Sequence, residues 1–101
     1  MAEKTVINIA KDYARQIKKK YDIINVYLFG SYANGNFNDD SDIDIAVVLK
    51  DYPHRNNMQL ELMRIRRDID SRIEPHPFRD SEFNEYNILA NEVLKNGILI
   101  S

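Results

Sequence analysis

Two aspartates, separated by a single residue, stand at the start of the longest strongly apolar stretch of the chain. Asp42 and Asp44 lead into a run that ends at Leu49. Residues two apart in a β-strand project from the same face, so both carboxylates point to one region, roughly 6–7 Å apart along the backbone. Two anions at the mouth of a buried strand repel each other unless a cation lies between them. Hard carboxylate oxygens suit Mg²⁺, which accepts one or two carboxylates together with substrate phosphates.

A glycine-serine pair precedes the aspartates. Gly30 and Ser31 follow the apolar segment 25–29 and open residues 31–34, which can form one helical turn. Backbone N–H groups at such a turn, together with the serine hydroxyl, can hold phosphate oxygens, and glycine permits close approach. If the strands on either side of the turn are neighbours, this phosphate cradle and the two carboxylates face one cleft. That arrangement suits metal-assisted phosphoryl or nucleotidyl transfer.

A calcium-binding loop and a purely structural role compete with this interpretation. The spacing of Asp40, Asp42 and Asp44 matches the start of an EF-hand loop. However, Ile45 occupies the sixth position, where glycine is needed, and Asp51 occupies the twelfth, where glutamate is expected. Calcium binding of this type is therefore disfavoured. Taken alone, the two aspartates could equally be turn formers or caps at a loop exit.

A P-loop is the other competing motif. Gly30 and Gly35 have the spacing of its two glycines. Asn36 and Phe37 stand where the P-loop requires a lysine and a hydroxyl residue, so the phosphate grip and the metal ligand are both missing.

Length and composition predict one ordinary globular domain, residues 1–101. The chain has 44% hydrophobic and 30% charged residues, whereas disordered chains are poorer in apolar residues. It has no cysteine, which excludes disulfides, thiolate catalysis and cysteine-ligated zinc and fits a reducing compartment. Its net charge of −2 offers no general attraction for nucleic acid or an anionic membrane.

No segment of the sequence predicts membrane insertion or export. The apolar run 43–49 is far shorter than the roughly 20 residues of a membrane span, and the N-terminal residues lack a signal-peptide core. We therefore expect a soluble, cytoplasmic protein.

Three helices are expected to position the candidate site. Apolar residues at three- and four-residue steps predict helices over residues 3–20 and 55–70. A third helix is predicted to begin after an N-cap at Ser81 and to end at Gly97. The second helix carries three arginines that either form a salt-bridged solvent face or contact phosphate or a partner. They are Arg64, Arg66 and Arg67.

Three main strands are expected between these helices. Residues 25–29 and 43–49 read as buried strands, and the uniformly apolar second one is placed centrally. Residues 72–78 read as a strand at the sheet edge, or one that ends near Pro75, because proline removes a ladder donor. Residues 98–100 read as a short final strand. This order of elements predicts a single α/β or α+β domain.

The motif residues resemble a known family. Gly30-Ser31, ten residues, and then Asp42-Ile43-Asp44 is similar to the Gly-Ser, x10, Asp-x-Asp signature of the DNA polymerase beta-like nucleotidyltransferase superfamily. The length of the chain and the run SDIDIAVVL resemble its minimal nucleotidyltransferase branch, which includes antitoxins paired with HEPN-type toxins. The resemblance implies a small mixed sheet flanked by helices. It also implies that Gly30 and Ser31 contact a triphosphate and that Asp42 and Asp44 ligate metal ions.

The same family uses a third carboxylate, on a later strand, to complete the metal site and help deprotonate the attacking hydroxyl. Glu74 is our candidate, because RIEPHPF is the later segment that reads as a strand in the required place. Asp68 and Asp70 compete, but they belong to the end of the preceding helix. One departure stands out: many minimal relatives carry arginine at the position of Asn34, whose neutral amide cannot make a bidentate, charge-assisted phosphate contact.

Three further side chains near the motifs have less defined roles. We interpret His54 and His76 as structural or surface residues, with His76 the nearer to the site. Tyr32 either stacks on a base or a partner, or packs the short turn.

The resemblance implies a Mg²⁺-dependent nucleotidyltransferase with two metal ions and ATP or another NTP as substrate. It would move a nucleoside monophosphate, most simply AMP from ATP, onto a hydroxyl of a partner protein such as a HEPN-type toxin. The alternative is a catalytically silent antitoxin that acts by binding its partner. Neither direct nucleic-acid binding nor membrane association is expected, and a hetero-oligomer or a homodimer is compatible with both. Transfer to a small molecule ranks last, because it needs a second lobe.

Overall fold

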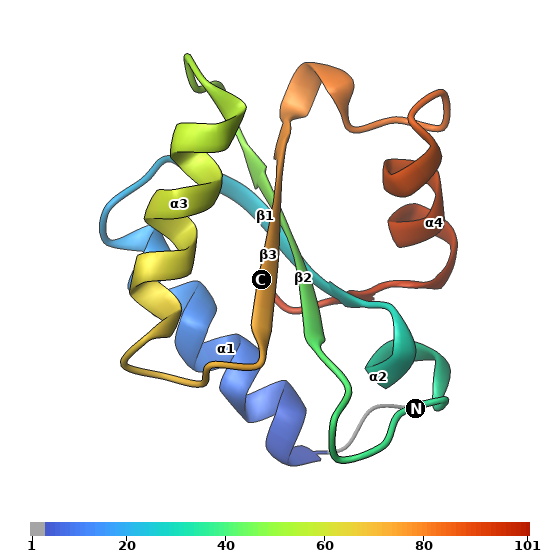
Figure 1. Ribbon diagram of the computed structural model, residues 1–101. Coiled ribbons are helices and arrows are strands. Elements are labelled where there is room, and N and C mark those ends of the chain that lie inside the picture. Colours follow the sequence, from blue (N-terminus) through green and yellow to red (C-terminus); the bar gives the residue numbers. More distant parts are fainter. Residues whose placement is uncertain (1–3) are drawn as a thin grey trace.

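The computed structural model describes residues 4–101, which form one mixed four-stranded sheet with helices on both faces (Figure 1). The strand order is β3-β2-β1-β4. β1 is antiparallel to β2 and to β4, whereas β2 and β3 are parallel. The strands are β1 (Ile23–Phe29), β2 (Ile43–Leu49), β3 (Ile73–Arg79) and β4 (Ile98–Leu99). The expected small mixed sheet is therefore confirmed.

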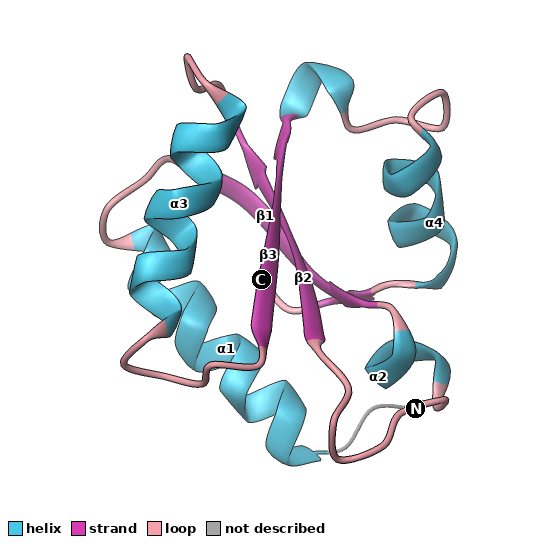
Figure 2. Ribbon diagram, in the orientation of Figure 1, coloured by secondary structure: helices cyan, strands magenta, loops and turns pink. Residues whose placement is uncertain are grey.

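The helices form two layers around the sheet (Figure 2). α1 (Lys4–Lys18) and α3 (Arg55–Arg66) cover one face, and α4 (Ile88–Asn96) lies on the other. The short α2 (Ser31–Asn34) follows β1 directly at the lower end of the sheet in Figure 1. The predicted start of the first helix at residue 3 lies outside the described residues. Within residues 4–101, no helix is both long enough and apolar enough to cross a membrane.

β2 occupies an interior position in the sheet, as its uniformly apolar sequence predicts. Its odd-numbered residues pack with α1, with Leu62 of α3 and with the buried residues of the adjacent strands. Its even-numbered Ala46 packs instead with α4 and with Phe29 and Phe78. Because side chains alternate along a strand, Asp44 belongs to this second face.

β3 lies at the edge of the sheet and continues through both of its prolines, so of the two predicted alternatives, an edge strand or a strand that ends near Pro75, the structure has the first. The carbonyl groups of Ile73 and Pro75 accept hydrogen bonds from Arg66 Nη1 at 2.7 Å and Gln59 Nε2 at 2.6 Å. These backbone atoms therefore face away from β2, and the missing N–H of Pro75 lies on that same outer side. The edge position was predicted correctly.

The second helix ends at Arg66 instead of residue 70. Asp70 uses its side chain to accept a hydrogen bond from the N–H of Arg72 at 2.9 Å. Such a bond stabilises a turn in competition with a further helical turn.

The N-cap predicted at Ser81 was wrong. Ser81 lies in a short 3₁₀-helix (Asp80–Glu82), and the final helix begins seven positions later with Asn87 as its cap. Asn87 Oδ1 accepts a hydrogen bond from the N–H of Ala90 at 3.0 Å. The intervening Phe83 stacks on Tyr27 of β1 with 5.4 Å between ring centroids, which fixes this segment against the sheet as a non-helical connection. Gly97 follows the helix, as expected.

Candidate active site

The candidate site lies at the end of the sheet where β1 finishes and β2 and β3 begin. Because β1 is antiparallel to β2 and β2 is parallel to β3, these three strand ends meet at one edge. Phe29, the last residue of β1, is opposite Asp44, and Asp44 is opposite Glu74. Gly30 and Ser31 follow at the same end and begin α2. The two segments that carry the motifs are therefore neighbours, as the cleft hypothesis requires.

Gly30 lies directly against the side chain of Asp44. A Cβ atom at position 30 would stand 2.3 Å from Asp44 Oδ2, closer than nonbonded atoms can approach. Gly30 also has φ +75°, a conformation that side chains other than glycine rarely adopt. Its carbonyl accepts hydrogen bonds from the N–H groups of Ala33 and Asn34, which turns the chain sharply after β1. Glycine is thus required both by the turn and by the carboxylate beside it.

Asp44 and Glu74 are the acidic pair that the sheet brings together. They occupy opposite positions on adjacent parallel strands, and such strands are about 4.8 Å apart. Both side chains are half-buried, whereas Asp42 lies one residue before β2 and is exposed. No three His, Asp or Glu side chains within residues 4–101 are grouped closely enough to hold a metal ion. By donor type and register, Asp44 and Glu74 fit a hard divalent cation, and Asp42 is the neighbouring acid that would have to turn inward.

His76 is the residue that the motif spacing did not assign to the site. Its Nε2 lies 3.2 Å from Asp44 Oδ1, and its ring meets Phe29 edge-on with 5.1 Å between centroids. The signal that could have found it is its position two residues after Glu74, which places both on one face of β3. His54, in contrast, is exposed at the start of α3, as predicted.

Tyr32 packs the turn. It is 2% exposed, stacks on Phe37 with 4.7 Å between centroids, and donates a hydrogen bond to the carbonyl of Asn38 at 3.3 Å. Its oxygen also accepts a bond from Arg72 Nη1 at 3.2 Å. Buried in this way, the ring is not available for a base to stack on.

An ion pair between Arg72 and Asp70 supports this end of the sheet. Arg72 Nη2 and Nε bond the two carboxylate oxygens of Asp70 at 2.9 and 3.1 Å, and these hydrogen bonds hold the pKa of Asp70 below its usual value. Asp70 is therefore already paired with Arg72. Asp68 is exposed and lies outside β3, so neither competitor occupies the position of Glu74.

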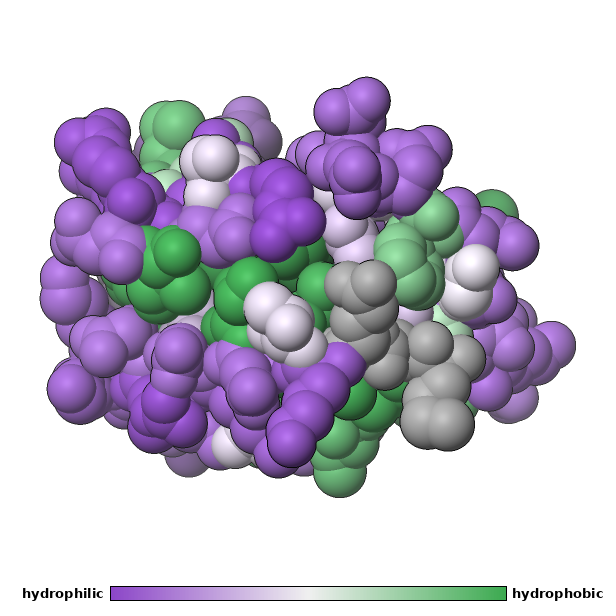
Figure 3. Space-filling view, turned by 90° about the horizontal axis from the view of Figure 1, so that it is seen from below, coloured by the Kyte–Doolittle hydropathy of each residue, from purple (hydrophilic) through white to green (hydrophobic). Residues whose placement is uncertain are grey.

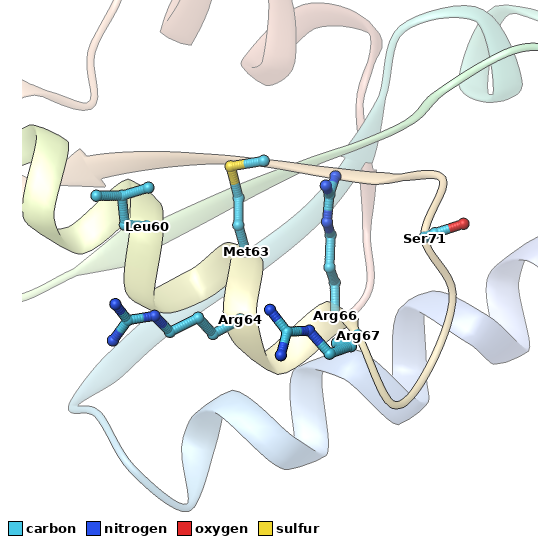
Figure 4. Close-up of a pocket in the computed structure, with 6 residues that line it drawn as sticks. All are labelled: Leu60, Met63, Arg64, Arg66, Arg67 and Ser71. Carbon is cyan, nitrogen blue, oxygen red and sulfur yellow. The ribbon is translucent and has the colours of Figure 1, made fainter.

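A separate pocket lies beside the arginine-rich α3. It is lined by Leu60, Met63, Arg64, Arg66, Arg67 and Ser71. Figure 4 shows Met63 and Arg66 extending from α3 toward β3, while Arg64 and Arg67 point elsewhere (Figure 4). Arg64 forms an ion pair with Glu61 at 3.0 Å, and Arg66 bonds the carbonyl of Ile73. For these two arginines, the structure favours the structural alternative over phosphate contacts.

The end of the molecule that carries the motifs is seen in Figure 3. Hydrophilic side chains surround a smaller group of hydrophobic ones there (Figure 3). Asn34 and residues 38–40 are exposed. A polar, accessible rim of this kind suits a charged ligand.

Comparison with known sequences gives one family and several relatives. The family described as "Polymerase beta, Nucleotidyltransferase" matches residues 7–101. Two proteins of Methanocaldococcus jannaschii, each named "Putative protein adenylyltransferase", are similar to the chain. One is 37% identical over 71 residues, 68% of this chain and 46% of that protein. The other is 38% identical over 52 residues, 48% of this chain and 50% of that protein. The chain spans about half the length of the curated relatives it matches.

Comparison with solved structures gives the same fold. A "putative nucleotidyltransferase" from Sulfolobus solfataricus superposes with a TM-score of 0.70 at 22% identity, over 94% of this chain and 78% of that one. A toxin–antitoxin with AMP-PNP superposes with a TM-score of 0.69 at 26% identity, over 90% of this chain and 72% of that one. A tri-AMPylated Shewanella oneidensis HEPN toxin in complex with MNT antitoxin gives 0.63 at 22% identity, over 94% and 71%. At 22% identity, the first and third likenesses establish the fold alone.

Proposed function

The chain belongs to the polymerase beta nucleotidyltransferase family, and from that premise we propose that it transfers AMP from ATP to a hydroxyl group of a partner protein. The observation that carries the proposal is the contact between the Gly30 turn and Asp44, with Glu74 on the neighbouring strand. A turn that can receive phosphate and an acidic pair that can receive a divalent cation therefore lie at one spot.

The residues of the site divide the reaction between them. The acceptor hydroxyl oxygen forms a bond to the α-phosphorus of ATP, the bond from that phosphorus to the bridging oxygen breaks, and pyrophosphate leaves with the electron pair. The turn at Gly30 and Ser31 would bind the leaving phosphates, because N–H groups in a first helical turn have no partner within the helix. Asp44 and Glu74, assisted by Asp42, would hold Mg²⁺, which supplies charge neutralisation and polarisation of the phosphate. Glu74 would accept the proton of the attacking hydroxyl, and two magnesium ions are the expected complement.

The partner is proposed from the relatives. Proteins named as protein adenylyltransferases share sequence with this chain, and a structure 26% identical to it is a toxin–antitoxin with AMP-PNP. We therefore propose ATP as the nucleotide and a HEPN-type toxin as the acceptor, in a hetero-oligomeric complex. We also propose that residues 1–101 form a single domain and that the protein acts in the cytoplasm.

Transfer of label from α-labelled ATP to a HEPN-type partner tests the function. With Mg²⁺ present, wild-type protein should label the partner, and Asp44→Ala and Glu74→Gln should each lower the initial rate at least about 100-fold. Asp68→Asn is the matched control, because this exposed acid is near Glu74 in sequence but outside β3. Transfer by Asp44→Ala at the wild-type rate, or none by wild-type protein, contradicts the proposal.

The exposed Asn34 supports a second candidate, an antitoxin that acts by binding alone. A neutral amide at this place cannot pair with phosphate as a guanidinium does. A toxin-neutralisation assay separates the two functions. If binding suffices, the double variant Asp42→Ala plus Asp44→Ala should still protect cells; if transfer is needed, protection is lost.

A further inference from the structure

We propose that His76 is a positioning residue that orients the Asp44 carboxylate for metal binding; this inference rests on the proposed function of the site. His76 Nε2 and Asp44 Oδ1 are 3.2 Å apart. A carboxylate that binds a metal ion is ionised and only accepts hydrogen bonds, so in that state the imidazole donates from Nε2. His76 therefore fixes the position of one oxygen of the Asp44 carboxylate.

The carboxylate is held from two sides. Asp44 Oδ1 faces His76, and Asp44 Oδ2 fills the space that a side chain at Gly30 would need, 2.3 Å from that Cβ position. With one oxygen bonded and the other placed beside the turn, the carboxylate has little freedom to rotate. A ligand fixed in this way loses less conformational entropy when it binds a metal ion.

His76 is itself held in place. Its ring packs edge-on against Phe29, which is 5% exposed and is opposite Asp44 in the β1–β2 register. The flanking Pro75 and Pro77 restrict the backbone on both sides of the histidine. The side chains of His76 and Asp44 are only 22% and 26% exposed, so water competes weakly for their hydrogen bond. Phe29, His76 and Asp44 thus form a chain of contacts that ends at Asp44 Oδ1.

The test is the affinity for Mn²⁺, measured from the electron paramagnetic resonance signal of the free ion. Removing a hydrogen-bond partner of a ligand typically weakens metal binding about 10- to 100-fold. His76→Phe should therefore raise the Mn²⁺ dissociation constant at least about tenfold. His76→Gln keeps an N–H donor, so its affinity should lie closer to that of the wild-type protein. His54→Phe, the same substitution at the exposed histidine, should leave the dissociation constant unchanged.

A second variant covers the case in which His76→Phe does not fold. Phe29→Leu removes the ring against which His76 packs but leaves the hydrogen-bonding groups in place, so it should weaken Mn²⁺ binding in the same direction. Circular dichroism and thermal unfolding identify folded variants. The inference is overturned if folded His76→Phe binds Mn²⁺ as tightly as wild-type protein, or if His76→Gln is as weak as His76→Phe. Absence of Mn²⁺ binding by wild-type protein overturns the proposed function as well, so the two failures are distinguishable.

Discussion

The two faces of the sheet differ in what they bury. On the face covered by α1 and α3, one continuous cluster contains most of the fully buried apolar side chains of residues 4–101. On the face covered by α4, a smaller cluster around Ala46 and Phe78 gives way to Asp44, Glu74 and His76 at one end. Adjacent residues of β2 serve both faces, because side chains alternate along a strand. The first face supplies stability, and the second leaves one end open for chemistry.

The largest expected effect comes from Ile45, which is fully buried on the α1–α3 face. Ile45→Ala should lower the free energy of unfolding by about 2–5 kcal/mol, through lost burial and the cavity left behind. Urea denaturation followed by circular dichroism measures this. Asp44→Ala, one residue away on the other face, should change stability by less than about 1 kcal/mol. If the two variants lost equal free energy of unfolding, the two faces would not differ in their contribution to stability.

Gly30 tests the open end of the second face. Gly30→Ala should lower AMP transfer about 100-fold, since a misplacement of about 1 Å at a reacting centre has that scale of effect, and its Cβ collides with Asp44 Oδ2. Gly35→Ala is a matched control, because Gly35 also has positive φ, +81°, but nothing lies within 4 Å of its Cβ position. Both variants should be destabilised by about 1–2 kcal/mol through backbone strain.

Comparison of initial rates for the two glycine variants isolates the collision from the strain. If Gly35→Ala slows transfer as much as Gly30→Ala, strain in the connection explains both, and the contact with Asp44 has no special role.

Tyr13 tests how a polar atom is accommodated on the closed face. Its hydroxyl donates a hydrogen bond to the carbonyl of Leu62 at 2.7 Å, and burial raises the pKa of Tyr13 well above its usual range. Tyr13→Phe should lower the free energy of unfolding by about 1 kcal/mol, because it removes a buried bond between α1 and α3. The midpoint of urea denaturation measures the change. No loss would mean that the bond contributes nothing beyond packing of the ring.

The smallest effect concerns Asp70, whose pKa is lowered by its hydrogen bonds from Arg72. A group with a lowered pKa in the folded state stabilises the fold above its unfolded-state value, and this contribution is lost as the pH falls through the folded-state pKa. Relative to Asp70→Asn, wild-type protein should be more stable at neutral pH by at most about 1 kcal/mol, because the pair is partly solvated. The difference should shrink as the pH falls below about 3.8, the ordinary value for aspartate. The midpoints of urea denaturation of both proteins, measured at several pH values, provide the test. A difference in stability that stays constant with pH would contradict the prediction.

Local sequence patterns predicted the parts of the fold in which local and tertiary preferences agree. The strand 43–49 and the helical turn 31–34 have the predicted bounds. The family signature placed Gly30 and Asp44 in one site because it spans two adjacent strands joined by one connection. Glu74 lies opposite Asp44 because the segment RIEPHPF forms a strand parallel to β2, and its role as the third carboxylate stays a prediction.

Tertiary contacts decided the features that the sequence did not predict. Ser81 has the chemistry of an N-cap, but Phe83 stacks on the sheet and the helix begins only at Ile88, with Asn87 as its cap. Pro75 normally ends a strand, yet here α3 supplies the hydrogen bond that its carbonyl needs. The position of His76, two residues after Glu74, indicates its face of β3, but its contact with Asp44, 32 positions away in the chain, depends on the pairing of β2 with β3. Pairing across the sheet, and not local propensity, created these contacts.

The outer edge of β3 has a consequence for association between molecules. Pro75 lacks a backbone N–H, and α3 side chains already occupy the carbonyls of Ile73 and Pro75. An added strand would find no donor at that proline, and the two carbonyls already accept hydrogen bonds from α3, so extension of the sheet there is disfavoured. The strand that carries Glu74 and His76 is thereby protected from templating the edge-to-edge aggregation that threatens an exposed strand.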